Sequence, residues 1–191
     1  MDLKPEVTKT HNLGLDVLLA LPATPVVTTA DQKVETKIDF TADDTLLATY
    51  IEVATLYVQK KIGRALINQT VVAEWDSVGG VVPLPYIPVS EITSVKTVAE
   101  NGDLTILELN AGYSIRNNKI RVSTGLGLRV TYIAGYGAAS TNVPTPLIQA
   151  VKRITTSLYD NRNDEMMETN IDQLAFNSMA LIQPYINYGS I

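Results

Sequence analysis

The chain has 191 residues, which is enough for one hydrophobic core and does not require a second domain. It contains no cysteine, which excludes disulfides, thiolate metal sites and a cysteine nucleophile. The formal net charge of -5 disfavours sustained binding to duplex nucleic acid, because affinity for phosphates comes largely from Lys and Arg.

The N-terminal 22 residues lack the features of a signal peptide. Their apolar run covers only Val17–Leu21, and acidic residues precede it where a signal peptide has basic ones. No stretch approaches the roughly 20 apolar residues that span a bilayer. We therefore expect a soluble intracellular protein without membrane association. The charged fraction of 18% is below average, which suggests that partners cover part of the surface.

Residues 1–27 have no sustained periodicity and contain three prolines, which is typical of an N-terminal arm that is mobile or bound to a partner. Residues 28–38 could form a short helix with Val34 and Ile38 facing the core.

A long helix is predicted near residues 42–62. Thr41 is a candidate N-cap, and Asp43 and Asp44 would place negative charge at the first turn. Gly63 supplies the stop. The apolar residues follow the spacing of one buried stripe: Leu47, Tyr50, Ile51, Ala54, Tyr57, Val58 and Ile62.

Residues 67–134 change to short β-branched runs separated by turn residues, which predicts an antiparallel β-rich insert. Asn117-Asn118 should form a tight turn between the strands Tyr113–Arg116 and Lys119–Val122, because Asn tolerates positive φ. Arg129–Ala134 is the last expected strand. Three prolines predict a sheet edge or a rigid extended connection: Pro83, Pro85 and Pro88.

Helical spacing returns near residues 146–161 and 170–183, with Pro184 ending the last helix. The fold class is therefore α+β, a helical frame interrupted by the β-rich insert. We expect one domain over residues 28–186, preceded by the arm at 1–27 and followed by a short tail at 187–191.

The sequence offers no catalytic, cofactor-binding or metal site. His11 is the only histidine and lies in the arm, so a serine triad or a multi-histidine metal site has too few ligands. Gly125–Val130 lacks the third glycine of a dinucleotide fingerprint and precedes a strand. Asp160–Glu165 lacks the glycine and ligand spacing of a calcium loop. We expect no cofactor and no enzymatic activity.

Tyrosine dominates the aromatic residues, with nine Tyr against two Phe and one Trp. Tyr is favoured where one end of a side chain packs and the other meets water or a partner. Tyr185 and Tyr188 near the C-terminus suit such an anchoring role, whereas Tyr50, Tyr57 and Tyr159 are expected at core edges.

Over residues 25–186 the order and spacing of short sequence motifs resemble those of the head-tail connector, or adaptor, proteins of tailed phages and prophages. Ile186 departs from this pattern, because an Arg is common at its position, and the arm is longer than usual. The motifs that carry the resemblance in the first half are Asp43-Asp44 with Leu47, Ile51, Ala54, Val58 and Gly63-Arg64, followed by Leu84-Pro85, Pro88-Val89, Ile92 and Val95. Those in the second half are Val130-Thr131-Tyr132, Ala134-Gly135-Tyr136-Gly137, Val143-Pro144, Pro146-Leu147 and Ala150, then Leu158-Tyr159 with Asn161-Arg162, and finally Leu181-Ile182 with Pro184-Tyr185.

This resemblance implies a connector domain that forms a homo-oligomeric ring, commonly of twelvefold symmetry. The ring would sit below the portal protein, extend the DNA channel and meet a downstream neck or stopper protein. DNA would only pass through the lumen. The protein would belong to the virion at the head-tail junction and to the host cytoplasm during assembly. In such families the C-terminal segment tends to dock on the portal, which makes Pro184, Tyr185, Tyr188 and Ile191 the candidate portal-binding residues.

Two other classes of function remain open from the sequence. The chain could be a stand-alone ligand-binding or nucleic-acid-binding module, with the β insert offering the site. An enzyme is the third hypothesis, and it has no residue motif in its favour.

Overall fold

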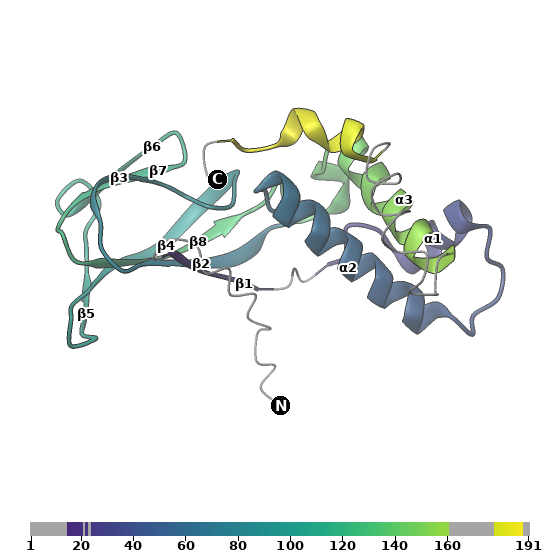
Figure 1. Ribbon diagram of the computed structural model, residues 1–191, viewed down its shortest axis with the longest axis horizontal. Coiled ribbons are helices and arrows are strands. Elements are labelled where there is room, and N and C mark those ends of the chain that lie inside the picture. Colours follow the sequence, from purple (N-terminus) through teal and green to yellow (C-terminus); the bar gives the residue numbers. More distant parts are fainter. Residues whose placement is uncertain (1–14, 21, 23, 161–177, 189–191) are drawn as a thin grey trace. The chain divides into compact units, whose positions relative to one another are not determined.

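The computed structural model describes residues 15–20, 22, 24–160 and 178–188 (Figure 1). These residues form two compact units. The β unit contains the described residues within 1–23, 63–136 and 187–191, and the helical unit contains those within 24–62 and 137–186. Helices together with antiparallel sheets confirm the predicted α+β class.

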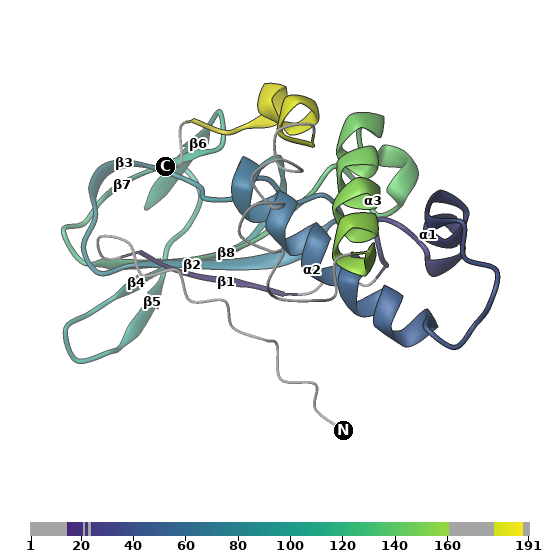
Figure 2. The same ribbon diagram turned by 45° about the vertical axis from the view of Figure 1, so that its right-hand side comes forward.

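The helical unit is built from three α-helices and two short 3-10 turns in the described part of the chain (Figures 1 and 2). Residues 178–182 are also helical and lead into the second 3-10 turn. The bounds are α1 Thr29–Thr36, α2 Asp44–Ile62, η1 Ser140–Asn142, α3 Thr145–Asp160 and η3 Gln183–Tyr185.

Helix α2 confirms the longest predicted helix and most of its buried stripe. Its first turn closes as the Leu47 amide donates to the Asp43 carbonyl at 2.8 Å, and Gly63 follows the helix with a φ of 61°. Tyr57 lies at the margin of the stripe, with 39% of its surface exposed. The buried residues are Leu47, Ile51, Ala54, Thr55, Val58, Gln59 and Ile62.

Helix α1 forms where it was expected, but the predicted face is wrong for Val34, which is 80% exposed. Gln32 is buried in its place and donates from Nε2 to the Lys152 carbonyl at 3.1 Å and to the Thr156 hydroxyl at 3.0 Å. A helix of eight residues has a weak apolar stripe, so these two hydrogen bonds to α3 set its rotation.

Polar contacts also tie the start of α2 to the other two helices. The Tyr159 hydroxyl on α3 donates to the Asp43 carboxylate at 2.6 Å, and Lys33 on α1 pairs with Asp44 at 2.8 Å. The Asp43-Asp44 pair therefore holds α1 and α3 against the start of α2, in addition to placing negative charge at the first turn.

The β unit contains a five-stranded sheet in the order β1-β2-β8-β4-β5 and a three-stranded sheet in the order β3-β7-β6. All pairings are antiparallel. The strands are β1 Leu15–Leu19, β2 Gln69–Trp75, β3 Gly79–Pro83, β4 Val89–Val98, β5 Leu104–Ile106, β6 Tyr113–Arg116, β7 Lys119–Ser123 and β8 Gly127–Ala134.

One apolar core joins the two sheets. Tyr132 on the central strand β8 is fully buried, and its hydroxyl accepts a hydrogen bond from the Tyr86 amide at 3.2 Å. Burial raises the pKa of Tyr132 well above its usual value, because the charged phenolate would lose its hydration. The core residues are Val17, Leu19, Ala65, Val71, Ala73, Val78, Leu84, Val95, Ile120, Val122, Leu128, Val130, Tyr132 and Ala134.

Strand β1 corrects the prediction of an arm without secondary structure for residues 15–19. It pairs with β2 at the edge of the five-stranded sheet, with Val17 opposite Ala73, and it buries Val17 and Leu19. Five residues carry too little alternation to be identified locally, and the backbone partners on β2 lie more than fifty residues away. Residues 1–14, including His11, lie outside the described part of the chain.

The predicted hairpin at Asn117-Asn118 is confirmed. Both turn residues have positive φ, 52° and 58°, and Arg116 faces Lys119 across the turn. The predicted last strand is also present and starts two residues earlier, at Gly127. Pro83 ends β3, an edge strand, as expected for a residue without an amide hydrogen.

The last predicted helix, 170–183, is described only in part. Residues 178–182 are helical, whereas 170–177 lie outside the described residues together with Ile171, Leu174 and Ala175. Pro184 lies within the 3-10 turn that follows the helix. The predicted boundaries of a connector domain at 28–186 and a tail at 187–191 stay a prediction.

Gly135 marks the closest backbone approach at the end of β8. Its φ is 150°, and a Cβ at this position would lie 2.4 Å from the Asn68 nitrogen and 2.5 Å from the Ile67 carbonyl carbon. Its amide donates to the Pro88 carbonyl at 2.9 Å. The glycine at position 135 is therefore required by packing between backbone segments.

We predict that Gly135→Ala lowers the free energy of unfolding by about 2–4 kcal/mol, because backbone atoms would have to move. Gly79→Ala is the matched control, since a Cβ there meets nothing within 4 Å, and it should change stability by less than about 0.5 kcal/mol. Chemical denaturation of both variants measures this. Equal stability of the two variants would contradict the packing argument.

Candidate functional site

Metal-binding groups and membrane-spanning helices were sought first among the described residues. Among residues 15–20, 22, 24–160 and 178–188, no group of three or more His, Asp or Glu is placed to hold a metal ion. Within the same ranges, no helix is both long enough and apolar enough to cross a membrane. Of the acidic segment Asp160–Glu165, only Asp160 is described, at the end of α3.

The glycines that resembled a dinucleotide fingerprint form a turn before β8. Gly125 has a φ of 70°, and its amide donates to the Val78 carbonyl at 2.9 Å. The Val78 amide donates back to the Leu126 carbonyl at 2.9 Å. At Gly127 a Cβ would lie 3.1 Å from the Trp75 carbonyl oxygen. These glycines serve the turn and close strand packing.

Two shallow hollows lie on the β unit. One is next to the Gly125 turn and includes Glu74, Asp76 and Glu100 in its lining. Glu74 accepts from Arg129 at 2.7 Å, so one of these carboxylates is already neutralised. The second hollow lies on the three-stranded sheet and is lined by Val81, Ser114, Arg116, Asn117, Lys119 and Arg121.

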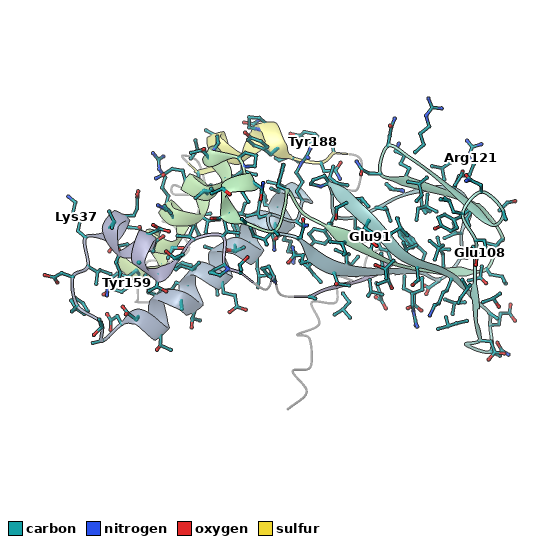
Figure 3. All side chains as sticks on the ribbon, turned by 180° about the vertical axis from the view of Figure 1, so that it is seen from behind. Lys37, Glu91, Glu108, Arg121, Tyr159 and Tyr188 are labelled. Atoms are coloured by element: carbon teal, nitrogen blue, oxygen red, sulfur yellow. The ribbon has the colours of Figure 1, made fainter. Side chains whose placement is uncertain are left out.

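The second hollow follows from the alternation along β7. Ile120 and Val122 point into the core and are buried, so Lys119, Arg121 and Ser123 point outward. Arg121 lies between Ser114 on β6 and Val81 on β3 in the sheet register. We call this surface the cationic face: Val81, Ser114, Arg116, Lys119 and Arg121. Figure 3 shows Arg121 on it. The sequence predicted this hairpin, but no role was assigned to its Arg and Lys residues.

The candidate portal-binding residues differ in exposure. Pro184 is exposed, Tyr185 is half-buried, and Tyr188 is 72% exposed (Figure 3). Ile191 lies outside the described residues. The preceding Ile182 is fully buried in the helical unit. The structure thus fixes the start of the C-terminal segment and leaves Pro184 and Tyr188 accessible.

Large apolar side chains are exposed on both units, which marks surfaces suited to protein partners when they cluster. In the helical unit they are Val34, Phe40, Val53 and Tyr57. In the β unit they are Val81, Leu104, Ile106, Leu109, Ile115 and Leu126. The exposed residues around β5 were missed from the sequence, although Leu and Ile beside the turn Asn101-Gly102 gave a signal that a hairpin would present them.

No family model and no curated protein sequence matches the chain. Solved structures do match. A chain in the neck of an empty gene transfer agent (GTA) particle, computed with C6 symmetry, has a TM-score of 0.72 and 23% identity, covering 91% of this chain and 95% of that chain. A chain in the virion of a native GTA particle gives the same values. A chain in the neck of a native GTA particle, computed with C12 symmetry, has a TM-score of 0.65 and 23% identity over 89% of this chain and 95% of that one.

The chain therefore shares its fold with proteins found in necks of GTA particles. The match extends over both units, so it covers the helical frame and the β insert together. This structural match agrees with the resemblance to head-tail connectors, which rested on sequence motifs alone.

Proposed function

We propose that this protein is a structural subunit of a phage-like virion neck, a connector that forms a ring below the portal and extends the DNA channel toward the tail. The observation that carries the proposal is the fold shared with a neck protein across 91% of the chain, at a TM-score of 0.72. The order of the sequence motifs from Asp43-Asp44 to Pro184-Tyr185 supports the proposal independently.

A homo-oligomeric ring is the assembly that this fold supports best. The similar neck structures were computed with C6 and C12 symmetry, and we propose twelve copies in the particle. A closed ring needs head-to-tail contacts between two different surfaces of each copy. The exposed apolar residues on both units of this chain offer such surfaces.

The proposed role is adhesive and not enzymatic. The functional surfaces of the described chain are exposed apolar and charged side chains, without a built catalytic or metal site. The formal net charge of -5 suits a channel that lets DNA pass, because tight phosphate binding would hold the DNA back. A downstream neck or stopper protein would continue the channel.

The C-terminal segment is the proposed portal-binding element. Tyr188 offers an exposed aromatic ring with a polar end, the kind of side chain that anchors protein interfaces. Pro184 limits the conformations of the segment, so less entropy is lost when it docks. Tyr185 and Ile191 complete the proposed contact.

A stand-alone binding module for nucleic acid is the second candidate, and the cationic face favours it. Arg116, Lys119 and Arg121 gather on one surface of an otherwise acidic chain. Three cations give only a small counterion-release term, so binding should be weak and strongly salt-dependent. Filter binding that detects no affinity for duplex DNA at low salt would remove this candidate.

We predict that the purified full-length chain forms cyclic oligomers, alone or when mixed with the portal protein of the same phage. Mass photometry should show a species of about twelve copies. Negative-stain images of that species should show closed rings. Monomers in both samples, at micromolar concentration, would contradict the proposed ring.

For the portal contact we predict that Tyr188→Ala weakens binding to the portal by tenfold or more, the loss typical of an aromatic hot spot. The unfolding free energy should change by less than about 0.5 kcal/mol, because the side chain is exposed. Pull-down with the portal protein and chemical denaturation measure the two effects.

Two control variants complete the portal test. Tyr57→Ala removes an exposed tyrosine from α2 and should leave portal binding unchanged. Ile182→Ala should instead cost about 2–5 kcal/mol of stability, because its side chain is fully buried. Portal binding by Tyr188→Ala at the wild-type level would show that the tail is not the docking element.

A further inference from the structure

The hairpin between β4 and β5 presents an apolar surface at the edge of the five-stranded sheet. Strand β5 pairs only with β4, so its other backbone edge carries no strand among the described residues. Exposed fractions are 41% for Leu104, 63% for Ile106 and 52% for Leu109. Exposed apolar edge strands usually bind a partner or cause aggregation.

The turn of this hairpin and the residues that follow it are acidic, whereas Lys96 on β4 lies opposite Ile106. Residues 99–112 contain Glu100, Asp103 and Glu108 and no Lys or Arg. The turn is held by the Asn101 side chain, which accepts from the Asp103 amide at 3.1 Å and donates to the Asp103 carboxylate at 2.6 Å. This short, ordered element thus combines exposed apolar side chains with negative charge. We call residues 99–109 the acidic hairpin.

The cationic face is its complement in charge. Strands β3, β6 and β7 contain no Asp or Glu, and Arg116 and Lys119 are direct cross-strand neighbours. Like charges in that position destabilise a sheet. Among the described residues neither forms an ion pair, and nor does Arg121. Val81 adds an apolar wall, being 48% exposed. The hollow is therefore suited to an element with negative charge and apolar side chains.

The β5 turn and the β6–β7 hairpin point in different directions on the β unit, whereas Glu108 lies beside the start of β6, where its carbonyl accepts from the Tyr113 amide at 3.3 Å. In Figure 1 the β5 hairpin extends downward and the β6–β7 hairpin upward, and Figure 2 shows the same separation after rotation. The β5 turn of one copy therefore points away from the cationic face of the same copy. Two different surfaces of a subunit are what a head-to-tail interface requires.

We propose that the acidic hairpin of one copy packs into the cationic face of the next copy around the ring. Ile106 and Leu109 bury apolar area against Val81, and the three carboxylates neutralise Arg116, Lys119 and Arg121. Charge also sets direction, because contacts between two cationic faces or two acidic hairpins would be repulsive. The inference rests on the proposed ring and adds the surfaces that join its copies.

Charge reversal tests the interface in full-length chains. Variant A carries Arg116→Glu, Lys119→Glu and Arg121→Glu, and variant B carries Glu100→Lys, Asp103→Lys and Glu108→Lys. All six side chains are exposed, so both variants should keep the wild-type circular dichroism. Variant A should also keep the wild-type melting temperature, whereas variant B loses the hydrogen bond from Asn101 to the Asp103 carboxylate and should melt slightly lower. Each alone should require at least tenfold higher concentration to assemble, as measured by mass photometry.

A mixture of A and B is the decisive sample. The acidic hairpin of A faces the cationic face of B, and the lysine hairpin of B faces the glutamate face of A, so alternating rings should form. A single chain that carries all six changes should assemble like the wild type. Failure of both the mixture and the six-change chain would overturn the interface.

The control variant places the same change of charge on the helical unit, with Lys37→Glu, Lys60→Glu and Lys61→Glu, all exposed. It should assemble like the wild type. If it disperses the rings as strongly as variant A, net charge sets assembly and the proposal is overturned.

Other outcomes separate the interface from the ring itself. If variant A and variant B each form rings as readily as the wild type, the proposed interface is overturned, but the proposed ring is not. A wild-type chain that stays monomeric, also with the portal, would remove the ring and the interface together. If A assembles normally but loses binding to a 30-base-pair DNA duplex in fluorescence anisotropy, the cationic face is a nucleic-acid site and the proposal fails.

Discussion

The packing around strand β8 is the constraint on which the β unit depends. β8 lies between β2 and β4, and its buried Tyr132 and Val130 share a core with Ile120 and Val122 of the second sheet. The strand ends at Gly135, where only a residue without Cβ permits the close backbone approach. Because this core is complete without the hairpin ends, the residues around β5 and the outer side of β7 are free to serve contacts with other molecules.

Sequence patterns predicted the elements that are determined by residues close together in the chain. The stripe of α2 extends over five turns and ends at a glycine with positive φ, and Asn117-Asn118 fits one type of hairpin turn. Strand β1 and the rotation of α1 could not be predicted in this way. β1 exists because a distant strand offers it backbone partners, and α1 is oriented by hydrogen bonds from Gln32 to α3. Both depend on tertiary contacts that no short window of sequence contains.

In the candidate site, too, some features could be predicted from local sequence and others depend on tertiary structure. The sequence showed that motifs for chemistry were lacking and pointed to the C-terminal tyrosines, of which Tyr188 is exposed. It did not show that the acidic residues near Gly102 and the cations near Asn117 point in different directions on one unit, because sheet topology decides this. At 23% identity the fold is shared with neck proteins over nearly the whole chain.

The central claim is that this chain works by adhesion within a phage-like neck. A cryo-EM reconstruction of the particle that carries it tests this most directly. The account predicts density for this fold as a closed ring between head and tail, with the same contact repeated between successive copies. Density for the chain as isolated copies, or its absence from the neck, would contradict the account.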